Sequence, residues 1–172
     1  MNKVEIGILS TEDWQTYKSL RLSSLMESPE SFGSTYEDEA EYPDEVWKSR
    51  LDPSGRVERA LPLVAEIDGT PSGLAWGLIH DPDSKTAHVY QMWVTPERRG
   101  KGLGRGLLKA IISWAQALQL NTLVLAVTTN NTAAISLYRS FGFVPVGNTE
   151  ELRSGSPLLA QPMALELCAN VE

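Results

Sequence analysis

The residues whose types and spacing best suit chemistry lie in the segment 91–106, which begins within an apolar stretch ending at Val94. Four glycines alternate there with other residues, and glycine lets the backbone approach a ligand closely and point successive N–H groups at it. A helix that starts in this segment adds the positive end of its dipole. The spacing predicts a phosphate cradle, with Arg99, Lys101 and Arg105 as cations around the phosphates.

Two common nucleotide-binding motifs have a different spacing from this one. In a Walker loop the lysine is followed by Ser or Thr, whereas Gly102 follows Lys101. A dinucleotide fingerprint carries glycines at its first, third and sixth positions. Counted from Gly100 the sixth position is Arg105, and counted from Gly102 it is Leu107. A nucleotide-binding module is therefore disfavoured.

The spacing that does match is Arg99-x-x-Gly102-x-Gly104, preceded by a strand that ends in residues 92–94. It resembles the pyrophosphate-binding signature of the GNAT (GCN5-related N-acetyltransferase) superfamily. A second landmark follows in residues 131–143, and it is similar to the family's helix after the fifth strand. Two landmarks in the right order and spacing are far more specific than one glycine turn.

The resemblance covers nearly the whole chain, because residues 21–33 are also similar to many bacterial members. It implies one N-acetyltransferase domain over residues 1–172, with an α/β (α+β) fold. In this fold a mixed central sheet of about seven strands is flanked by helices and splayed at the fourth and fifth strands. The implied reaction is direct attack of a primary amine, on a small molecule or a protein, on acetyl-CoA. The alternative is a non-catalytic acyl-CoA-binding sensor domain.

The resemblance also implies which residues bind the co-substrate. Backbone groups of Met92, Trp93 and Val94 pair with the pantetheine arm like an added strand, and the N–H of Met92 holds the acyl carbonyl oxygen. Asn131 matches a cofactor-contacting asparagine, although it suits a helix cap equally well. The residues expected around the pyrophosphate are Arg99, Gly100, Lys101, Gly102, Leu103, Gly104 and Arg105.

Tyr138 matches the family tyrosine that protonates the departing CoA thiolate. A phenol with a pKa near 10 can serve as the acid for a thiolate leaving group within hydrogen-bond reach. The other interpretation of Tyr138 is a core residue of an amphipathic helix, as expected for Leu137 and Phe141. The matched landmark favours the acid.

The general base is less well defined by the resemblance. One branch of the family carries a glutamate where this chain has Ala126, and the histone-acetylating branch carries one where it has His88. With an ordinary pKa near 6.5, His88 can accept a proton directly or through water. A water relay through Tyr90 or Gln91 is equally open. The second histidine, His80, has no support from any motif.

The acceptor pocket is expected in the connection after the first helix, where Phe32 and Tyr36 lie, with Tyr90 as a further substrate contact. The acidic run 37–41 suits a cationic amine, but charge runs are usually solvated surface. Protein N-termini, lysines, polyamines, aminoglycosides and amino acids all remain open as acceptors.

The elements that position these residues follow from the periodicity of apolar positions. A hairpin is expected around Asp68-Gly69, and a long helix is expected from Gly102 or Gly104 to Leu118. The predicted strands, which include the two strands of this hairpin, are 4–8, 63–67, 73–79, 86–94, 123–127, 143–146 and 163–167. The remaining predicted helices are 10–28, 38–51 with an interruption near Pro43, and 131–142.

Composition and charge bound the classes of partner. The 172 residues are 42% hydrophobic and 22% charged, which is ordinary for a soluble domain, and the net charge of −7 argues against nucleic acid. No apolar run is long enough for a membrane helix. Cys168 is the only cysteine, so neither an internal disulfide nor a thiol-based metal site is expected. The sequence thus predicts a cytoplasmic, metal-free protein, free of membrane and nucleic-acid partners, and a homodimer is compatible with it.

Overall fold

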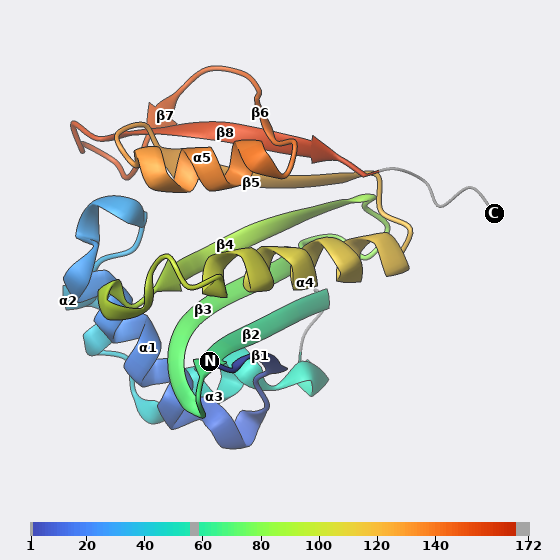
Figure 1. Ribbon diagram of the computed structural model, residues 1–172. Coiled ribbons are helices and arrows are strands. Elements are labelled where there is room, and N and C mark those ends of the chain that lie inside the picture. Colours follow the sequence, from blue (N-terminus) through green and yellow to red (C-terminus); the bar gives the residue numbers. More distant parts are fainter. Residues whose placement is uncertain (1, 56–58, 168–172) are drawn as a thin grey trace.

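The computed structural model describes residues 2–55 and 59–167. In this part of the chain, eight strands form one sheet in the order β1-β2-β3-β4-β5-β8-β6, and β7 pairs with β8 (Figure 1). All neighbours are antiparallel except β4 and β5, so the sheet is mixed. The strands are β1 (Val4–Ile8), β2 (Arg59–Ile67), β3 (Thr70–Ile79), β4 (Thr86–Val94), β5 (Thr122–Thr128), β6 (Val144–Pro145), β7 (Glu150–Glu151) and β8 (Leu159–Glu166).

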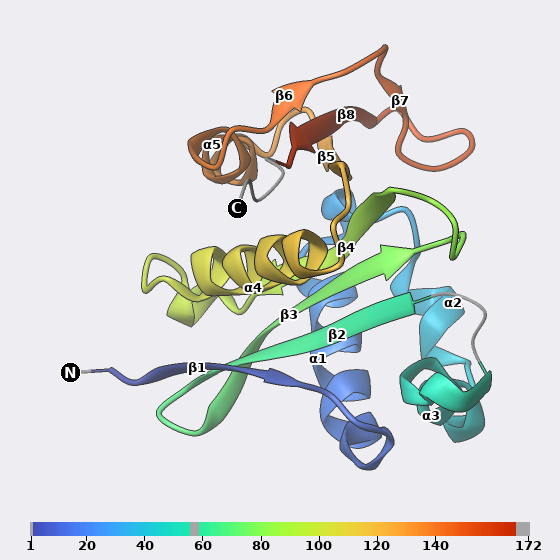
Figure 2. The ribbon, with the colours of Figure 1, turned by 90° about the vertical axis from the view of Figure 1, so that its right-hand side faces the viewer.

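Helices cover both faces of the sheet. One face packs against α4, and the opposite face of β3 and β4 packs against α1 (Figures 1 and 2). The α-helices are α1 (Trp14–Glu27), α2 (Tyr36–Ala40), α3 (Asp44–Leu51), α4 (Leu103–Ala117) and α5 (Thr132–Ser140). Short 3-10 turns are η1 (Thr11–Asp13), η2 (Pro29–Ser31), η3 (Pro53–Gly55) and η4 (Pro96–Arg98).

The alternation of side chains along β3 divides the core into two clusters. Ala75 faces the cluster built around α4 and α5, whereas its neighbours Leu74 and Trp76 face the cluster built around α1 and α3. Both faces are covered, which explains why β2 and β3 are apolar almost throughout. In the second cluster, the ring of Tyr17 lies 5.5 Å from those of Trp47 and Trp76.

Helix α4 is amphipathic, and its apolar stripe fixes it on the sheet. Its buried side chains recur at helical spacing, and they pack against β1, β2, β3 and β4. Because the stripe determines how α4 lies on the sheet, it also aims the start of the helix at the carboxyl end of β4. The buried residues are Leu103, Leu107, Leu108, Ile111 and Ala115.

Strands β4 and β5 part after a short common stretch. They pair only at Thr86–Thr122, Ala87–Leu123 and His88–Val124, yet β4 continues to Val94 and β5 to Thr128. This confirms the expected splay of the fourth and fifth strands. Beyond the third pair, the facing edges of the two strands have no partner strand among the described residues.

Strands β2 and β8 begin four residues before their predicted starts, and the predicted helix 10–28 opens with the 3-10 turn η1; two further differences concern the number of elements. The expected helix 38–51 is two helices, α2 and α3, because Pro43 lacks the N–H that a continuous helix requires. The sheet has eight strands rather than about seven, since the two-residue strand β7 has no periodic signal. Cys168 lies outside the described residues. No helix within residues 2–55 and 59–167 is long and apolar enough to span a membrane.

Candidate active site

A cleft of about 1030 Å³ opens where β4 and β5 separate. Its two walls are the parts of β4 and β5 that do not pair with each other, residues 89–94 and 125–128. One end reaches the glycine-rich turn and the start of α4, and the other reaches η2, β7 and the loop that follows Ser31. The lining of the cleft therefore has two parts with different chemistry, the glycine-rich turn with its arginines and the carboxylates of η2 and β7.

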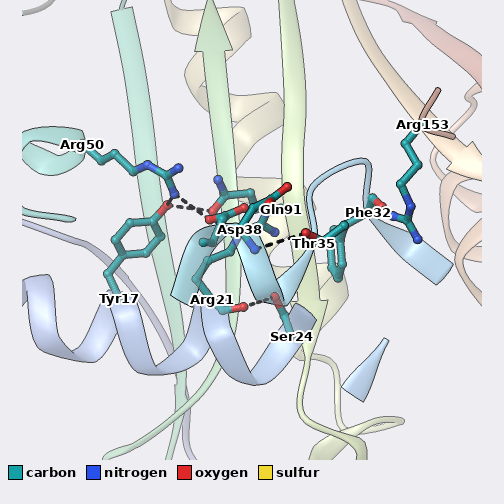
Figure 3. A network of polar contacts seen from close by, with 10 residues as sticks. Tyr17, Arg21, Ser24, Phe32, Thr35, Asp38, Arg50, Gln91 and Arg153 are labelled. Atoms are coloured by element: carbon teal, nitrogen blue, oxygen red, sulfur yellow. Dashed lines mark hydrogen bonds and ion pairs between the residues drawn. The ribbon is translucent and has the colours of Figure 1, made fainter. Parts of the chain in front are cut away.

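Strand β4 is bent at the cleft by a bulge. Leu74 of β3 pairs with Trp93 and Trp76 pairs with Tyr90, so Ala75 faces two residues of β4. One of these two, Gln91, has φ of +57°, a left-handed conformation that is rare in a strand. The hydroxyl of Tyr17 donates a hydrogen bond to Oε1 of Gln91 at 3.0 Å (Figure 3). Helix α1 therefore holds the bulge in place.

The glycine-rich turn presents backbone N–H groups to the cleft. Gly100 and Gly102 have φ of +77° and +90°, which only glycine adopts readily, and a Cβ at either position would meet nothing within 4 Å. The first hydrogen bond of α4 runs from Gly106 N–H to the carbonyl oxygen of Gly102. The preceding N–H groups of the helix therefore lie outside its ladder and are free for an anion.

The fourth glycine of the motif serves packing rather than ligand binding. A Cβ at Gly106 would lie 3.1 Å from Cδ1 of Ile6, so the glycine lets α4 approach β1. Gly106 is also absent from the described residues that line the cleft. The four glycines thus have different roles. Gly100 and Gly102 shape the turn, Gly104 lies in the cleft wall, and Gly106 lets the helix pack closely on the sheet.

Arg99 is fixed at the mouth of the cradle by contacts with the protein. Its Nε donates to the carbonyl oxygen of Val94 and its Nη2 to Oε2 of Glu27, both at 2.9 Å. The same carboxylate oxygen accepts from Nε1 of Trp93 at 2.8 Å and from Oγ of Ser28. Burial raises the pKa of Glu27, but these donors outweigh it and hold the pKa below its usual value.

The other cations around the cradle differ in their position. Arg98 and Arg105 line the cleft, and Arg105 is held by Oγ of Ser140 at 3.2 Å and by the ring of Phe141 at 4.7 Å. Lys101, which the sequence places among the phosphate contacts, is exposed and is not among the described residues that line the cleft. The structure thus brings two of the three expected cations to the cleft.

Tyr138 lies in the wall of the cleft opposite β4. It stands on α5, is 6% exposed, and packs its ring edge-on against Phe143 at 5.8 Å. Burial raises the pKa of its phenol well above the ordinary value. Tyr138 is therefore a protonated donor throughout the neutral range, which a proton donor to a thiolate requires. Its burial confirms the interpretation as a core residue, and its place in the cleft wall is compatible with the acid role, which stays a prediction.

Asn131 caps helix α5, and its Oδ1 accepts the N–H of Ala134 at 3.2 Å. This is the cap function that the sequence allowed. Asn131 also lines the cleft, with Asn130 and Ala133 beside it. A contact between Asn131 and a ligand is thus compatible with the cap.

His88 stands at the last pair that joins β4 to β5 and is not among the described residues lining the cleft. Burial and the nearby His80 lower its pKa. Its ring is stacked on that of Tyr90, which does line the cleft, with centroids 5.7 Å apart and an interplanar angle of 5°. Tyr90 therefore lies in the cleft wall, and His88 packs against its ring; the role of His88 as the base stays a prediction.

The far end of the cleft contains Phe32, as expected, and a buried arginine beside it. Arg21 is 4% exposed and pairs with Glu39 through both Nε and Nη2, at 3.2 and 2.8 Å. Nη1 of Arg50 reaches the same carboxylate at 2.8 Å. Burial raises the pKa of Glu39, but the two arginines outweigh this and hold it below its usual value. Glu39 therefore serves to hold these two arginines in place. Tyr36, expected in the same pocket as Phe32, lines a separate hollow instead.

The comparisons with known proteins settle the family. The profile of the Acetyltransferase (GNAT) family matches residues 21–143, which include the bulge, the cradle, both walls of the cleft and Tyr138. The chain belongs to the GNAT family. The membership expected from its two landmarks is thereby confirmed.

Among its relatives, the mycothiol acetyltransferase of Thermobispora bispora is 33% identical over 135 residues. The aligned region is 76% of this GNAT chain but 43% of that protein, so the chain spans less than half of the relative's length. A Salmonella typhimurium protein solved with its cofactor acetyl-CoA superimposes with a TM-score of 0.76 at 20% identity, covering 99% of this chain and 97% of that one. The spermidine N-acetyltransferase of Vibrio cholerae, solved with CoA and spermine, gives 0.72 at 22% identity and 95% of both chains. These two likenesses show the shared fold.

Sequence reasoning missed three features of this GNAT site. Glu27, which holds Arg99, and Gln91, which makes the bulge, carry no motif of their own. Arg21 lies within a segment quoted for the resemblance, but the sequence does not indicate that it pairs with Glu39. The described residues contain no cluster of three or more His, Cys, Asp or Glu placed to hold a metal ion.

Proposed function

We propose that this GNAT protein transfers the acetyl group of acetyl-CoA to a primary amine of a small molecule or a peptide, by direct attack of the amine on the thioester. One observation carries the proposal: the gap between β4 and β5 runs directly into the glycine cradle at the start of α4. An extended thioester arm with a pyrophosphate at one end has this same layout.

The residues present fit acetyl-CoA as a substrate. The N–H groups of Leu103, Gly104 and Arg105 are free for the pyrophosphate, and Arg99 and Arg105 add charge beside them. Backbone groups of residues 92–94 face the gap, where the pantetheine arm would pair with them. The thioester supplies the activated acetyl group, and the chain has to orient it and handle the protons.

The N–H of Met92 would hold the acyl oxygen as negative charge develops on it. A backbone donor in such a place contributes about 3 kcal/mol in comparable oxyanion holes. Tyr138 would give its proton to the departing thiolate, because its phenol is protonated at neutral pH and lies in the cleft wall. A non-catalytic acyl-CoA sensor, the alternative, requires none of this machinery beyond the cradle.

The acceptor is proposed only as a class. The relatives' names include mycothiol and spermidine as acetylated compounds, which are chemically unlike each other. The end of the cleft at η2 and β7 contributes Glu30, Glu150 and Glu151, so an acceptor that carries an ammonium group is compatible with it.

The test is an acceptor screen with mass detection of the acetylated product, run together with release of CoA. The panel covers polyamines, amino acids, aminoglycosides, amino sugars and peptides. Acetyl-CoA alone should raise the melting temperature, because a ligand at 100 times its Kd stabilises the folded state by about 2.7 kcal/mol. Binding of acetyl-CoA without any product favours the sensor, whereas absence of binding contradicts both candidates.

A further inference from the structure

Tyr90 and His80 form a contact at the side of the cleft that the roles above leave unused. The hydroxyl of Tyr90 lies 2.8 Å from Nε2 of His80. Tyr90 lines the cleft and is 41% exposed, whereas His80 directly follows β3 and faces solvent. The pair therefore connects the cleft with the surface of the molecule through a single hydrogen bond.

The register of β3 and β4 brings these residues together. Trp76 pairs with Tyr90 and Leu78 with His88, so alternate residues of the two strands share one face of the sheet. His88 fills the space between the others: it stacks on Tyr90, and its ring lies edge-on to His80 at 4.8 Å. His88 thus fixes the orientation of both rings.

The two rings that contact His80 are both neutral at neutral pH. Burial, together with His80, lowers the pKa of His88, so His88 is neutral at neutral pH. Burial raises the pKa of the Tyr90 phenol, so Tyr90 is neutral as well. Asp81 and Asp83 lie in the turn after His80, and Arg59 pairs with Ile79 on the neighbouring strand.

The carboxylates that line the cleft are less suited to accept a proton from an acceptor ammonium. Glu27 accepts three hydrogen bonds and its pKa is lowered, so it is a weak base. Glu30, Glu150 and Glu151 are exposed on η2 and β7. They belong to the end of the cleft where an acceptor would enter.

We propose that Tyr90 and His80 form a proton relay that deprotonates the acceptor ammonium; the relay rests on the proposed acetyl transfer. An N–H bond of the ammonium breaks and its proton bonds to Oη of Tyr90, while the proton of Tyr90 passes to Nε2 of His80. The imidazolium of His80 then loses its Nε2 proton to solvent, which leaves the neutral Nδ1–H tautomer, and the hydroxyl of Tyr90 turns to donate to Nε2 again. The free amine keeps its lone pair for the thioester carbonyl.

The relay is tested with Tyr90→Phe, His80→Gln and the double variant on an acceptor that the wild-type protein acetylates. Each single change should lower kcat/KM for the acceptor at pH 7 by about 10²-fold, the usual scale for a general base. The double variant should be no worse than either single one, because one broken link disables the chain of transfer. The Kd for acetyl-CoA should stay within about twofold, since neither side chain belongs to the cradle.

The pH profile distinguishes the relay from a structural role. In both variants the defect should shrink as pH rises toward the pKa of the acceptor amine, because the amine then arrives deprotonated. Tyr42→Phe, outside the cleft, serves as the control for loss of a tyrosine hydroxyl, and Glu150→Gln and Glu151→Gln test the entrance carboxylates. Losses that multiply in the double variant, a pH-independent defect, or full activity in Tyr90→Phe would each overturn the relay. Absence of wild-type turnover on the whole panel overturns the proposed function instead, and the relay with it.

Discussion

The hydroxyl of Tyr17 on helix α1 lies 3.0 Å from Oε1 of Gln91, the one residue in the described part of β4 with a positive φ. The bond connects two residues 74 positions apart. It ties the bulge, and with it the backbone of residues 92–94, to the core packed around Trp47 and Trp76. The shape of the cleft wall thus depends on a helix on the far face of the sheet.

The bulge reverses the usual preference of a strand. Valine is normally more stable than glycine in a strand, but a β-branched residue at φ of +57° costs about 1–2 kcal/mol. We therefore expect Gln91→Val to be less stable than Gln91→Gly, by about 1 kcal/mol in urea unfolding. Both variants lose the Tyr17 bond, so that loss cancels in the comparison. A more stable Gln91→Val protein would show that β4 is regular in solution.

Two glycines of the same motif should fail in different ways. Gly102→Ala places a side chain at φ of +90°, so we expect weaker acetyl-CoA binding, about tenfold in Kd, together with a stability loss of about 1–2 kcal/mol. Gly106→Leu puts a branched side chain where even a Cβ would lie 3.1 Å from Ile6, so it should lower stability while leaving the Kd unchanged. Calorimetric titration and urea unfolding measure the two effects. An equal effect on Kd would mean that the boundary of the cradle is misplaced.

Tyr138→Phe should separate chemistry from binding. The ring keeps its contact with Phe143, so acetyl-CoA affinity should stay within about twofold, while turnover falls by about 10²-fold. Because burial raises the pKa of Tyr138, the wild-type rate should show no alkaline decline from this group across the neutral and mildly alkaline range. Steady-state kinetics between about pH 6 and pH 9 would measure the turnover of the variant and the pH dependence of the wild-type rate. Undiminished turnover in the variant would leave Tyr138 as a packing residue only.

The buried pair of Arg21 and Glu39 should make the free energy of unfolding depend on pH in the acidic range. The pKa of Glu39 is below its ordinary value of 4.5, so its contribution is complete above that value and is lost as pH falls through the folded-state pKa. Glu39→Gln leaves Arg21 and Arg50 without their carboxylate, and we expect a loss of about 3–5 kcal/mol at pH 7. The difference in unfolding free energy between the wild-type protein and Glu39→Gln, measured by urea unfolding, should narrow below about pH 4. The exposed control variant Glu41→Gln should stay within about 0.5 kcal/mol of the wild-type value.

The part of the site that the sequence could predict is the part built from local patterns. The cradle depends on glycines a few residues apart, and the stripe of α4 fixes where its helix starts, so Gly102 and Leu103 were recognisable. The gap between β4 and β5 came from the family resemblance rather than from any property of the strands. Tyr138 was placed by the same resemblance, and its burial agrees with both interpretations.

The remaining features depend on register, which the sequence does not reveal. His80 reaches Tyr90 only because the β3–β4 hairpin aligns Leu78 with His88, and the bulge near Gln91 changes the alignment of the residues beyond it. Glu27 meets Arg99 across 72 positions, and nothing in the spacing of either residue indicates the contact. Long-range polar contacts of this kind follow from the packed fold and not from periodicity.

The three pairs that join β4 to β5 have a consequence for how the molecule unfolds. Strands β1–β4 form one continuous antiparallel ladder and β5–β8 another, so the sheet consists of two plates that share a short seam. Opening at the seam costs few backbone hydrogen bonds, and elsewhere the core packed around α4 and α5, together with polar contacts such as that of Arg105 with Ser140, resists it. We therefore expect a ligand bound between the two plates to join them more firmly and to make their unfolding more cooperative.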